Sequence, residues 1–483
     1  MDEEKKQGET INLKDTGEAE PRPLKGIWFK FVSLIAILLS IFQLYTAWAG
    51  AFPNLIQRSI HLAFVLVLAF SLYPWSQKRS PKERFSFPDS VLVVLSLIAC
   101  IFIVLNYDRI MLHPGESTKL EIALGILTTV LVLEATRRTL GIVLPILAIL
   151  SLGYAYFGPY LPGVWAHRGF STSYIFETLY LSSQGIWGMT TGVSATVVAA
   201  FLIFGAVLYS TGGGEIFVEL AQWIAGRSHG GPAKVSCFSS AFFGTISGSA
   251  VANVVVDGVF NIPLMKRLGY KPEFAAAVEA TASTGGQIMP PVMGAGAFIM
   301  AELIGIPYVK IALAAAIPAI LYYIGVTACV HFEAQRAGLQ KIPVELIPSI
   351  RKILPRSAPL FIPVVLLIFL MVKGYNPTLA VFWSIVSAII LYLIGGRSWR
   401  QFIEKFKNII NSLESGGRSI VLVASLCTCA QIIIGMFNLT GLGIKMSEII
   451  IGLSAGSLFL ALFFSMIICL ILGMGVPTTA AYM

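Results

Sequence analysis

Ten apolar runs, each long enough to cross a bilayer as a helix, constrain this chain more than any other feature. They lie at about residues 28–48, 58–75, 90–107, 120–136, 139–158, 192–211, 309–331, 357–373, 377–394 and 417–436. Composition agrees, since 56% of the 483 residues are hydrophobic, only 12% are charged and the mean hydropathy is +0.80. A soluble domain does not have this composition. We therefore expect an all-α polytopic membrane protein.

Three further apolar stretches are interrupted by glycine and proline, at about residues 236–263, 273–303 and 452–483. The first contains GTISGSAVANVVVDG, which begins at Gly244 and places Gly, Ser, Thr, Asn and Asp in an apolar setting. Irregular backbone at membrane depth is tolerated only where protein, water or an ion satisfies its N–H and C=O groups. These stretches are the candidate ligand sites, with close packing of small residues as the alternative explanation for GTISGSA alone.

The net charge of +9 follows from membrane topology. If the N-terminus is cytoplasmic and the spans alternate, all but seven of the 34 Lys and Arg lie on the cytoplasmic side; the exceptions are Arg58, Arg109, Lys119, Arg168, Lys310, Lys373 and Lys445. This distribution satisfies the positive-inside rule, and without a basic stripe it argues against a nucleic-acid partner. Residues 1–27 are expected to be a disordered cytoplasmic tail that leads into a retained first helix.

An internal repeat relates two parts of the chain at a constant offset. TGGGEIF begins at Thr211 and TGLGIKM begins at Thr440, an offset of 229 residues. The same offset carries Gly244 onto Gly473, the start of GMGVPTTAAYM, and Ser249 onto Thr478. Each copy therefore has a spanning helix, a T-G-x-G break, a short amphipathic segment and a glycine-rich polar motif inside an apolar run.

The number of crossings between the copies predicts their relative orientation. One broken segment and four spans separate them, so the second copy, about 357–483, is expected to be inverted relative to the first, about 192–331. Inverted repeats that contain broken helices are typical of secondary transporters, whose substrate and ions bind near the midplane. The two glycine-rich motifs are then opposed re-entrant hairpins, whose tips offer carbonyls and hydroxyls to a cation and helix N-termini to an anion.

The third broken segment, EATASTGGQIMPPVMGAG at 279–296, predicts a helix that unwinds and restarts inside the membrane. Thr281, Ser283, Thr284 and Gln287 precede the pair Pro290–Pro291, and proline interrupts helical hydrogen bonding. We expect the unwound centre of this segment to face the first hairpin tip.

These motifs carry a family resemblance. FGTISGSAVANVVVDGVFNIPLMKRLGY, ASTGGQIMPPVMGAGAFIMAE and LGMGVPTTAAY resemble segments of the large membrane subunit of tripartite ATP-independent periplasmic (TRAP) transporters. Residues 28–138, with four spans, are similar to the small membrane subunit and are expected to form a scaffold, while 139–483 form the transport domain. A single chain that carries both the small-subunit and the large-subunit parts resembles the fused permeases that work with TAXI-type binding proteins.

The resemblance implies an elevator-type Na⁺ symporter of the bacterial inner membrane that imports organic anions, usually carboxylates, from a periplasmic binding protein. By position it assigns substrate and Na⁺ binding to Ser247, Gly248, Ser249, Asn253, Thr281, Ser283, Thr284 and Gly285, and in the second hairpin to Gly473, Gly475, Pro477, Thr478 and Thr479. Asp257 and Gln287 are further candidates. The family continues beyond the position of Met483, so the second repeat is expected to be incomplete here.

Several alternatives remain open at the level of sequence. Asp257 either binds the ion directly or caps or positions the second hairpin arm, and Glu279 is expected near the membrane interface because it follows Lys271 closely. A channel would use similar re-entrant hairpins. An intramembrane serine hydrolase would need a base beside the TISGS serine, yet the five histidines, His61, His113, His167, His229 and His331, lie outside the glycine-rich motifs. No phosphate-binding loop for ATP is present, which favours an ion gradient as the energy source.

Overall fold

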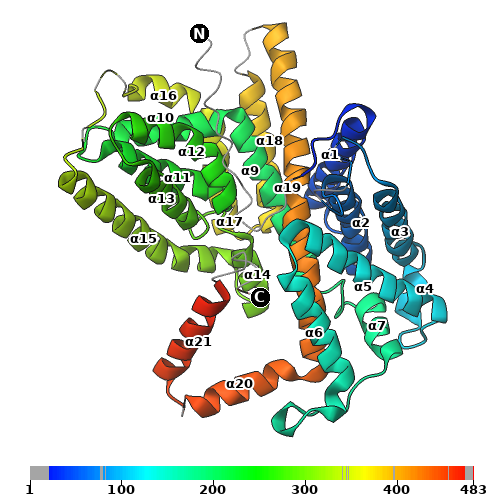
Figure 1. The fold of residues 1–483 in the computed structure, drawn as a ribbon. Coiled ribbons are helices and arrows are strands. Elements are labelled where there is room, and N and C mark those ends of the chain that lie inside the picture. Colours follow the sequence, from blue (N-terminus) through cyan, green and yellow to red (C-terminus); the bar gives the residue numbers. More distant parts are fainter. Residues whose placement is uncertain are drawn as a thin grey trace. The chain divides into compact units, whose positions relative to one another are not determined.

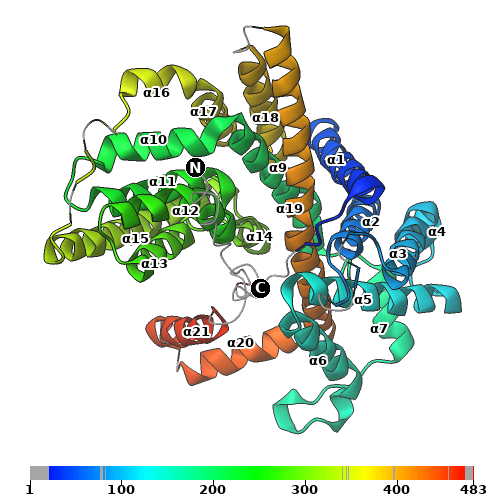
Figure 2. The same ribbon diagram turned by 45° about the horizontal axis from the view of Figure 1, so that its top comes forward.

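The computed structural model describes residues 21–76, 80–81, 83–339, 341–343, 345, 347–394, 398–454, 456–473 and 482. Within these residues the regular structure is helical and no strand is found (Figures 1 and 2). The chain divides into two compact units. The first contains the described residues up to Ile35, Phe52–Gly192 and the chain from Val421 onward, and the second contains Ala36–Ala51 and Val193–Ile420. The prediction of an all-α polytopic membrane protein is confirmed.

The first unit is built around helices from the N-terminal third of the chain. It includes α2 (Asn54–Leu72), α3 (Phe87–Leu105), α4 (Tyr107–Leu112), α5 (Lys119–Leu140), α6 (Val143–Phe157), the short turns η2 (Gly158–Tyr160) and η3 (Gly163–Trp165), α7 (Thr172–Leu181), α20 (Leu442–Leu453) and α21 (Leu458–Gly473), with parts of α1 (Gly26–Ala49), α8 (Met189–Val193) and α19 (Trp399–Thr440). Helices α2, α3 and α5 pack against one another, and α7 packs on α5. Helix α3 starts at a capping box of Ser86 and Asp89, which fixes its first turn.

A buried ion-pair cluster connects the N-terminal segment to this unit. Asp89 Oδ2 accepts from Arg22 at 2.7 Å and Asp89 Oδ1 accepts from Arg138 at 2.6 Å, and all three side chains are almost fully buried. Arg22 lies inside the segment expected to be a disordered tail, so that expectation does not hold for the residues just before α1. One carboxylate paired with two guanidinium groups strengthens the junction of α3 and α5 only as long as all three partners are present.

The second unit contains the glycine-rich motifs of the first repeat. In chain order it has η4 (Ser194–Val198), α9 (Ala199–Leu208), η5 (Tyr209–Gly213), α10 (Gly214–Ala225), α11 (Gly231–Ser247), α12 (Ala250–Arg267), α13 (Pro272–Gly285), α14 (Ala295–Ile304), α15 (Tyr308–Arg336), α16 (Ile350–Arg356), α17 (Ala358–Val372) and α18 (Pro377–Ile394). Helices α11, α12 and α13 lie side by side and pack against one another, and α15 packs on α11 and α13 (Figures 1 and 2).

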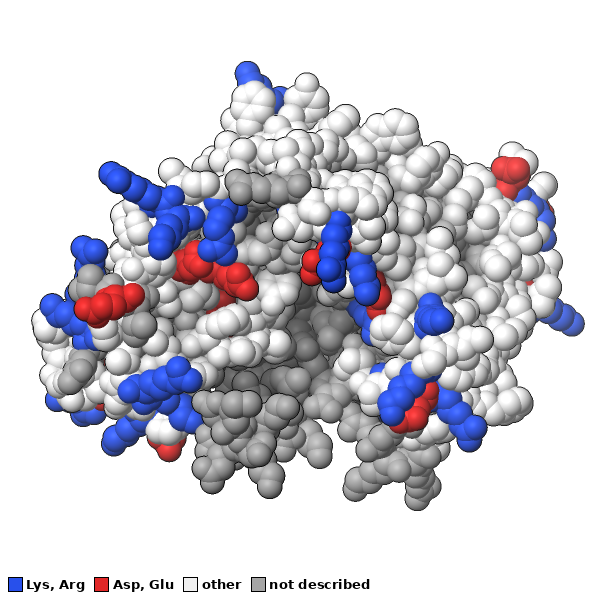
Figure 3. All heavy atoms as spheres, turned by 90° about the horizontal axis from the view of Figure 1, so that it is seen from above, with Lys and Arg blue, Asp and Glu red and all other residues white. Residues whose placement is uncertain are grey.

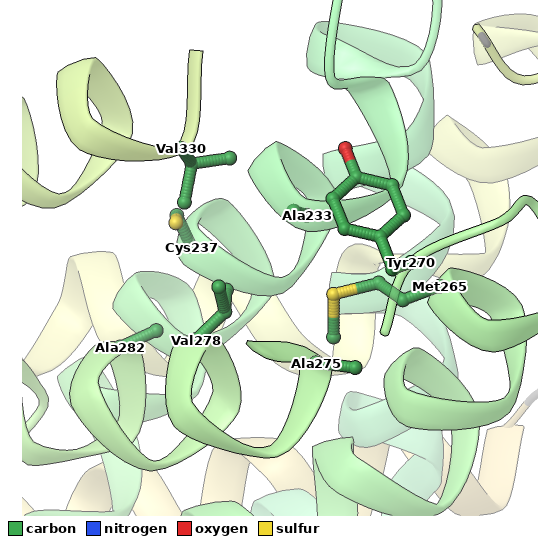
Figure 4. Close-up of a cluster of buried hydrophobic side chains, with 8 residues drawn as sticks. All are labelled: Ala233, Cys237, Met265, Tyr270, Ala275, Val278, Ala282 and Val330. Atoms are coloured by element: carbon green, nitrogen blue, oxygen red, sulfur yellow. The ribbon is translucent and has the colours of Figure 1, made fainter. Parts of the chain in front are cut away.

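A small apolar core joins these helices near one end of the bundle. Cys237 of α11, Val278 of α13 and Val330 of α15 point toward one another, and Met265 of α12 lies beside Ala275 (Figure 4). These side chains are buried and pack the four helices against one another. Buried polar side chains of the same helices, among them Ser236 and Glu279, are the immediate sequence neighbours of Cys237 and Val278 and lie on another helix face.

Each of the ten predicted spans overlaps a helix. Eight described helices are long and apolar enough to cross a membrane, and α16 with α17 forms a further candidate that bends by 63°. The run at 120–136 lies on α5, which also carries Glu121, Glu134, Arg137 and Arg138, and it is more polar than the other spans. The run at 417–436 is part of α19, which extends over 42 residues.

The T-G breaks of the two repeats have matching backbone geometry. Gly212 has a φ of 97° inside η5, and Gly441 has a φ of 69° between α19 and α20. A 12-residue helix follows each break, namely α10 and α20. Only glycine adopts this conformation without strain. The repeated glycine therefore changes the direction of the chain at equivalent positions of the two copies. The inversion of the second copy stays a prediction.

Lys and Arg side chains are frequent on the face shown in Figure 3. Helix α16, at the top of Figure 1, carries three of the basic residues that the positive-inside rule assigns to the cytoplasm: Arg351, Lys352 and Arg356. Arg356 pairs with Glu219 of α10 at 3.1 Å. The orientation of the chain across the membrane stays a prediction.

Candidate functional site

The first glycine-rich motif folds as a helical hairpin. Helix α11 ends at Ser247, Gly248 follows in the left-handed conformation with a φ of 60°, and α12 begins after Ser249. A left-handed glycine ends helices readily because it has no Cβ. The Ser249 hydroxyl accepts from the Ala252 N–H at 3.2 Å, which makes it the N-cap of α12. The motif therefore specifies a sharp reversal between two antiparallel helices.

The hydroxyls at this tip have local structural partners. Ser247 Oγ accepts from the Ser249 N–H at 3.2 Å and lies 3.3 Å from the Ser249 carbonyl oxygen. Both serines are only partly buried. Their contacts shape the turn and leave oxygen lone pairs for a ligand.

The broken segment of the sequence unwinds as predicted. Helix α13 ends at Gly285, α14 begins at Ala295, and the residues between them are not helical. The Gly294 N–H donates to the Gln287 carbonyl at 2.8 Å and closes a compact loop, in which the Pro290–Pro291 peptide is cis. The two half-helices present a C-terminal and an N-terminal dipole end on either side of this loop.

The hairpin tip packs directly on the unwound segment. A Cβ on Gly248 would overlap the Met293 carbonyl, and a Cβ on Gly244 would overlap Gly286. Asn253 also lies against Gly286, where a Cβ would be 3.0 Å from its Nδ2. The prediction that the unwound centre faces the hairpin tip is confirmed. Glycine is needed here because two backbones approach within van der Waals contact.

Of the four predicted site residues on α13, two are buried and two are exposed. Ser283 is buried, and its hydroxyl donates to Glu279 at 3.2 Å. Thr281 and Thr284 are exposed, and the Thr284 hydroxyl donates to the Ala280 carbonyl of its own helix. Gly285 is buried. A Cβ at this position would lie 2.6 Å from the Tyr322 ring. Only Ser283 therefore joins the polar groups that lie behind the tip.

Glu279 is fully buried, so the expectation that it lies near the interface is wrong. Its carboxylate accepts from Ser236 at 2.6 Å, from Asn261 at 3.2 Å and from Ser283 at 3.2 Å. Glu279 is only eight residues from Lys271 along the chain, and that distance does not determine its burial. Helix α13 packs against α11, α12 and α15, which remove this side chain from solvent.

Asp257 is also fully buried, on the face of α12 that carries Asn253 and Asn261. Ser239 and Ser240 lie beside its carboxylate, but neither carboxylate oxygen has a hydrogen-bond partner of normal geometry. Asp257 does not cap the hairpin, because Ser249 does. A direct role of Asp257 in ion binding stays a prediction.

Three tyrosines of α15 hold the broken helix and were not anticipated from the sequence. Tyr322 and Tyr323 donate to the Thr281 and Ala282 carbonyls at 2.7 and 2.9 Å, and Tyr308 donates to the Val292 carbonyl at 2.6 Å. The last four carbonyls of a helix lack intrahelical partners, so Tyr323 satisfies a group that would otherwise be unpaired, while Tyr322 and Tyr308 fix the turn before the break and the loop after it. No local pattern on α15 predicts this role, because the carbonyls that accept these hydrogen bonds are distant in sequence.

The polar side chains behind the tip did leave a signal in the sequence. Asn253, Asp257 and Asn261 follow one another at four-residue spacing, as do Ser236 with Ser240 and Glu279 with Ser283. Four-residue spacing places side chains on one helix face. Three polar stripes on neighbouring apolar helices predict a shared buried cluster.

A cavity of about 810 Å³ lies elsewhere in the second unit. Gln43, Phe298, Glu302, Tyr308 and Asn376 are among the residues that line it. None of the predicted site residues lines this cavity, so its volume does not mark the tip as a site. The tip is a candidate site because of its broken backbone.

The second hairpin cannot be compared in the same detail. Gly473 is the last residue of α21, and Gly475, Pro477, Thr478 and Thr479 lie outside the described residues. Within the described part of the chain, no group of three His, Cys, Asp or Glu side chains is arranged to hold a metal ion.

A family model described as the DctM component of the tripartite ATP-independent periplasmic transporter matches residues 127–483. This match covers the hairpin, the unwound segment and the start of the second repeat. The chain belongs to this family of TRAP transporter permeases. The family resemblance is thereby confirmed at the level of the large permease subunit, while the fused small subunit and the TAXI type remain predictions.

Three relatives illustrate how the match is distributed. An uncharacterised protein, y4mL, of Sinorhizobium fredii is 27% identical over 242 residues, which cover 49% of this chain and 56% of the relative. The sialic acid TRAP permease SiaM of Vibrio cholerae is 23% identical, over 48% of this chain and 54% of SiaM. The C4-dicarboxylate TRAP permease DctM of the same organism is 26% identical, over 37% of each chain. The chain thus spans about half the length of the first curated relatives it matches.

Membership in this family also excludes the alternative of an intramembrane serine hydrolase. The relatives DctM and SiaM are named as transporter permeases, and the family is not enzymatic. The hydrolase interpretation of TISGS is therefore wrong. The assignment of individual residues to substrate or Na⁺ stays a prediction.

Proposed function

We propose that this chain is the permease of a Na⁺-coupled secondary importer for an organic anion of the carboxylate class. In this proposal it lies in the bacterial inner membrane with its N-terminus in the cytoplasm, receives substrate from a periplasmic binding protein, and moves its transport domain as an elevator. Residues 28–138 are proposed to act as the scaffold of a fused, TAXI-associated permease.

The observation that carries the proposal is the contact of the hairpin tip with the unwound helix. At this contact the N-terminus of α12, the C-terminus of α13 and the irregular backbone of 286–294 come together. Helix N-termini favour anions, while C-termini and free carbonyls favour cations. One small region can therefore bind an anionic substrate and a hard cation side by side, which is the arrangement that symport requires.

The substrate class is supported by the printed functions of two relatives. The Vibrio cholerae relatives are named for C4-dicarboxylates and for sialic acid. Both substrates carry carboxylate groups, and the family description names a periplasmic transport system. Carboxylates suit a tip that offers backbone N–H groups of α12, and a soluble binding protein would deliver them.

Uptake by the full-length permease in proteoliposomes tests this proposal. Radiolabelled carboxylates would be offered with and without a Na⁺ gradient, and with and without the binding protein. We expect saturable accumulation only when both are present. Accumulation without the binding protein would reject the tripartite mechanism, and accumulation without Na⁺ would reject Na⁺ coupling.

The same vesicles separate a symporter from a channel. A symporter moves substrate and ²²Na⁺ in a fixed ratio and saturates with substrate, whereas a channel passes ions without this ratio. Na⁺ flux that is independent of substrate would favour the channel.

A further inference from the structure

The cavity of about 810 Å³ in the second unit has a lining that suits a ligand of its own. Its walls come from the end of α1, from η4, from the connection between α14 and α15, and from the connection between α17 and α18. Pockets for small molecules commonly have volumes of about 300–1,000 Å³. The cavity is therefore large enough for a ligand with both a polar and an apolar part.

Glu302 of α14 supplies the charge in this cavity. It is exposed, and it is the one charged side chain among the described residues that line the cavity. Lys310 and Lys373 are close along the chain to two of the wall segments, but neither lines the cavity, and Lys373 Nζ lies 5.8 Å from the centre of the Phe369 ring. A carboxylate in a cleft with low-dielectric walls attracts positive charge.

Aromatic rings line the same cavity. Phe298 precedes Glu302 by one helical turn, and its ring stacks on that of Tyr308 with the ring centres 4.2 Å apart. Tyr375 and Trp48 line other walls and are about half exposed. Aromatic faces attract cations, and several rings together are a common way to bind quaternary ammonium groups.

The remaining walls are mostly apolar, with Val197, Met371 and Leu379 among their residues. Asn376 adds a carboxamide whose Oδ1 accepts from the Thr378 N–H at 3.0 Å and from the Thr378 hydroxyl at 2.9 Å, which fixes its orientation. A hard inorganic cation needs several oxygen ligands around one point. These walls suit an organic cation with an apolar body better.

We propose that this cavity binds an amphiphile whose ammonium group pairs with Glu302 and whose apolar body lies along Val197, Met371 and Leu379. Two sources supply this chemistry. One is a soluble alkylammonium compound, and the other is phosphatidylethanolamine, which carries an ammonium group on its headgroup beside two acyl chains. The inference depends neither on the transported substrate nor on Na⁺ as the coupling ion.

A ligand in this cavity would also act on the unwound segment. The Tyr308 ring belongs to the cavity wall, while its hydroxyl donates to the Val292 carbonyl at 2.6 Å. The next carbonyl, that of Met293, lies against Gly248 of the hairpin tip. A ligand packed on Phe298 and Tyr308 would therefore restrain the segment that contacts the tip. We expect it to slow uptake, and this expectation rests on the proposed function, whereas binding to the cavity does not.

Isothermal titration calorimetry of the purified full-length permease tests the site without any transport. The probe is hexyltrimethylammonium, and its control is hexanesulfonate, which has the same chain and the opposite charge. We expect saturable binding of the cation only. Glu302→Gln should weaken this binding about tenfold, as for loss of one interaction with a charged group.

Glu448→Gln is the matched control, because it removes an exposed carboxylate of α20 that does not line the cavity. It should bind the cation as the wild type does. The proposal would be overturned by the absence of saturable binding, by equal binding of hexanesulfonate, or by equal affinities of the wild type and Glu302→Gln.

The lipid that co-purifies with the permease distinguishes the two sources. Enrichment of phosphatidylethanolamine over phosphatidylglycerol in the wild type, with loss of this enrichment in Glu302→Gln, would support the lipid headgroup. The same phosphatidylethanolamine content in both proteins, with the calorimetric difference retained, would support a soluble ammonium compound.

Uptake in proteoliposomes tests the action through Tyr308. Hexyltrimethylammonium should inhibit the wild type at the concentrations that saturate calorimetric binding, and Glu302→Gln should need about tenfold more of it. Saturated binding without inhibition would overturn the action on the unwound segment. A permease without any uptake would reject the proposed function, while calorimetry would still decide whether the cavity binds the cation.

Discussion

Gly244, Gly248 and Gly286 set the distance between the hairpin and the unwound segment. At Gly248 a side chain would be disfavoured twice, by a φ of 60° and by the Met293 carbonyl. At Gly244 and Gly286 the helix and the loop touch backbone to backbone. The contact proposed to bind substrate and ion thus depends on the absence of side chains.

Gly244→Ala should therefore separate the tip from the unwound segment. Its new methyl group would overlap Gly286, and overpacking of this kind typically costs about 1–3 kcal/mol. We expect at least a tenfold loss of uptake, measured in proteoliposomes, with normal membrane insertion. Gly325→Ala on α15 is the matched control, because nothing lies within 4 Å of its Cβ position. Equal effects of both substitutions would contradict the close contact.

Ser249 combines a capping role with a predicted ligand role, and two variants separate them. Ser249→Ala removes the cap and should cost about 1 kcal/mol of stability, whereas Ser249→Asn keeps a capping oxygen and alters the ligand position. We expect both to weaken Na⁺-dependent uptake but only Ser249→Ala to lower the melting temperature in detergent.

Ser171→Ala supplies the control for this pair. Ser171 caps α7 in the first unit, where its hydroxyl accepts from the Tyr174 N–H at 3.3 Å. Ser171→Ala should lower stability by an amount similar to that of Ser249→Ala and leave the Na⁺ dependence of uptake unchanged. If Ser249→Asn transports with wild-type Na⁺ dependence, Ser249 is only a cap.

At the scale of elements, packing accounts for what the sequence could and could not predict. Helix positions followed from apolar runs, and the hairpin and the unwound segment followed from Gly248 and from the Pro290–Pro291 pair, because these residues act on their own backbone. The burial of Glu279 depends on three neighbouring helices, and the tyrosine contacts of α15 join residues about 40 positions apart. The tyrosine contacts leave no local pattern, whereas the four-residue spacing of Glu279 and Ser283 does place both side chains on one helix face.

The ion-pair cluster of the first unit makes a separate prediction at this scale. Asp89→Asn would leave Arg22 and Arg138 buried with reduced compensation, and removal of one partner from a buried pair costs about 3 kcal/mol or more. We expect a clear fall in melting temperature of the purified permease.

Glu333→Gln is the matched control, since it removes an ion pair with the exposed Arg336 on α15. Exposed pairs contribute about 1 kcal/mol or less, so the melting temperature should hardly change. An Asp89→Asn variant as stable as the control would show that the N-terminal segment is not anchored by this cluster.

At the scale of the whole molecule, two independent features agree with a transporter. The matching glycines at 212 and 441 repeat one backbone break at a fixed offset, and the family match extends from residue 127 through both copies. A repeat of this kind gives two similar halves that can exchange roles on opposite sides of a membrane. The elevator motion and the inversion of the second copy are the parts of the proposal that depend on this relation.

Accessibility of introduced cysteines tests the predicted topology. Single cysteines at Lys352 of α16 and at Lys373 after α17 are expected on opposite sides, because one apolar helix separates them. A membrane-impermeant maleimide added to intact cells with a permeable outer membrane should label only the cysteine at 373. Labelling at 352 would reverse the proposed orientation.

The most direct test of the central claim is the Na⁺ dependence of substrate uptake by the full-length permease with its binding protein. Wild type would be compared with Ser247→Ala, Ser249→Ala and Thr284→Ala at saturating substrate. The account predicts that at least one variant needs about tenfold more Na⁺ for half-maximal uptake, equivalent to about 1.4 kcal/mol, with normal insertion. An unchanged Na⁺ dependence in all three variants would contradict an ion site at the hairpin tip.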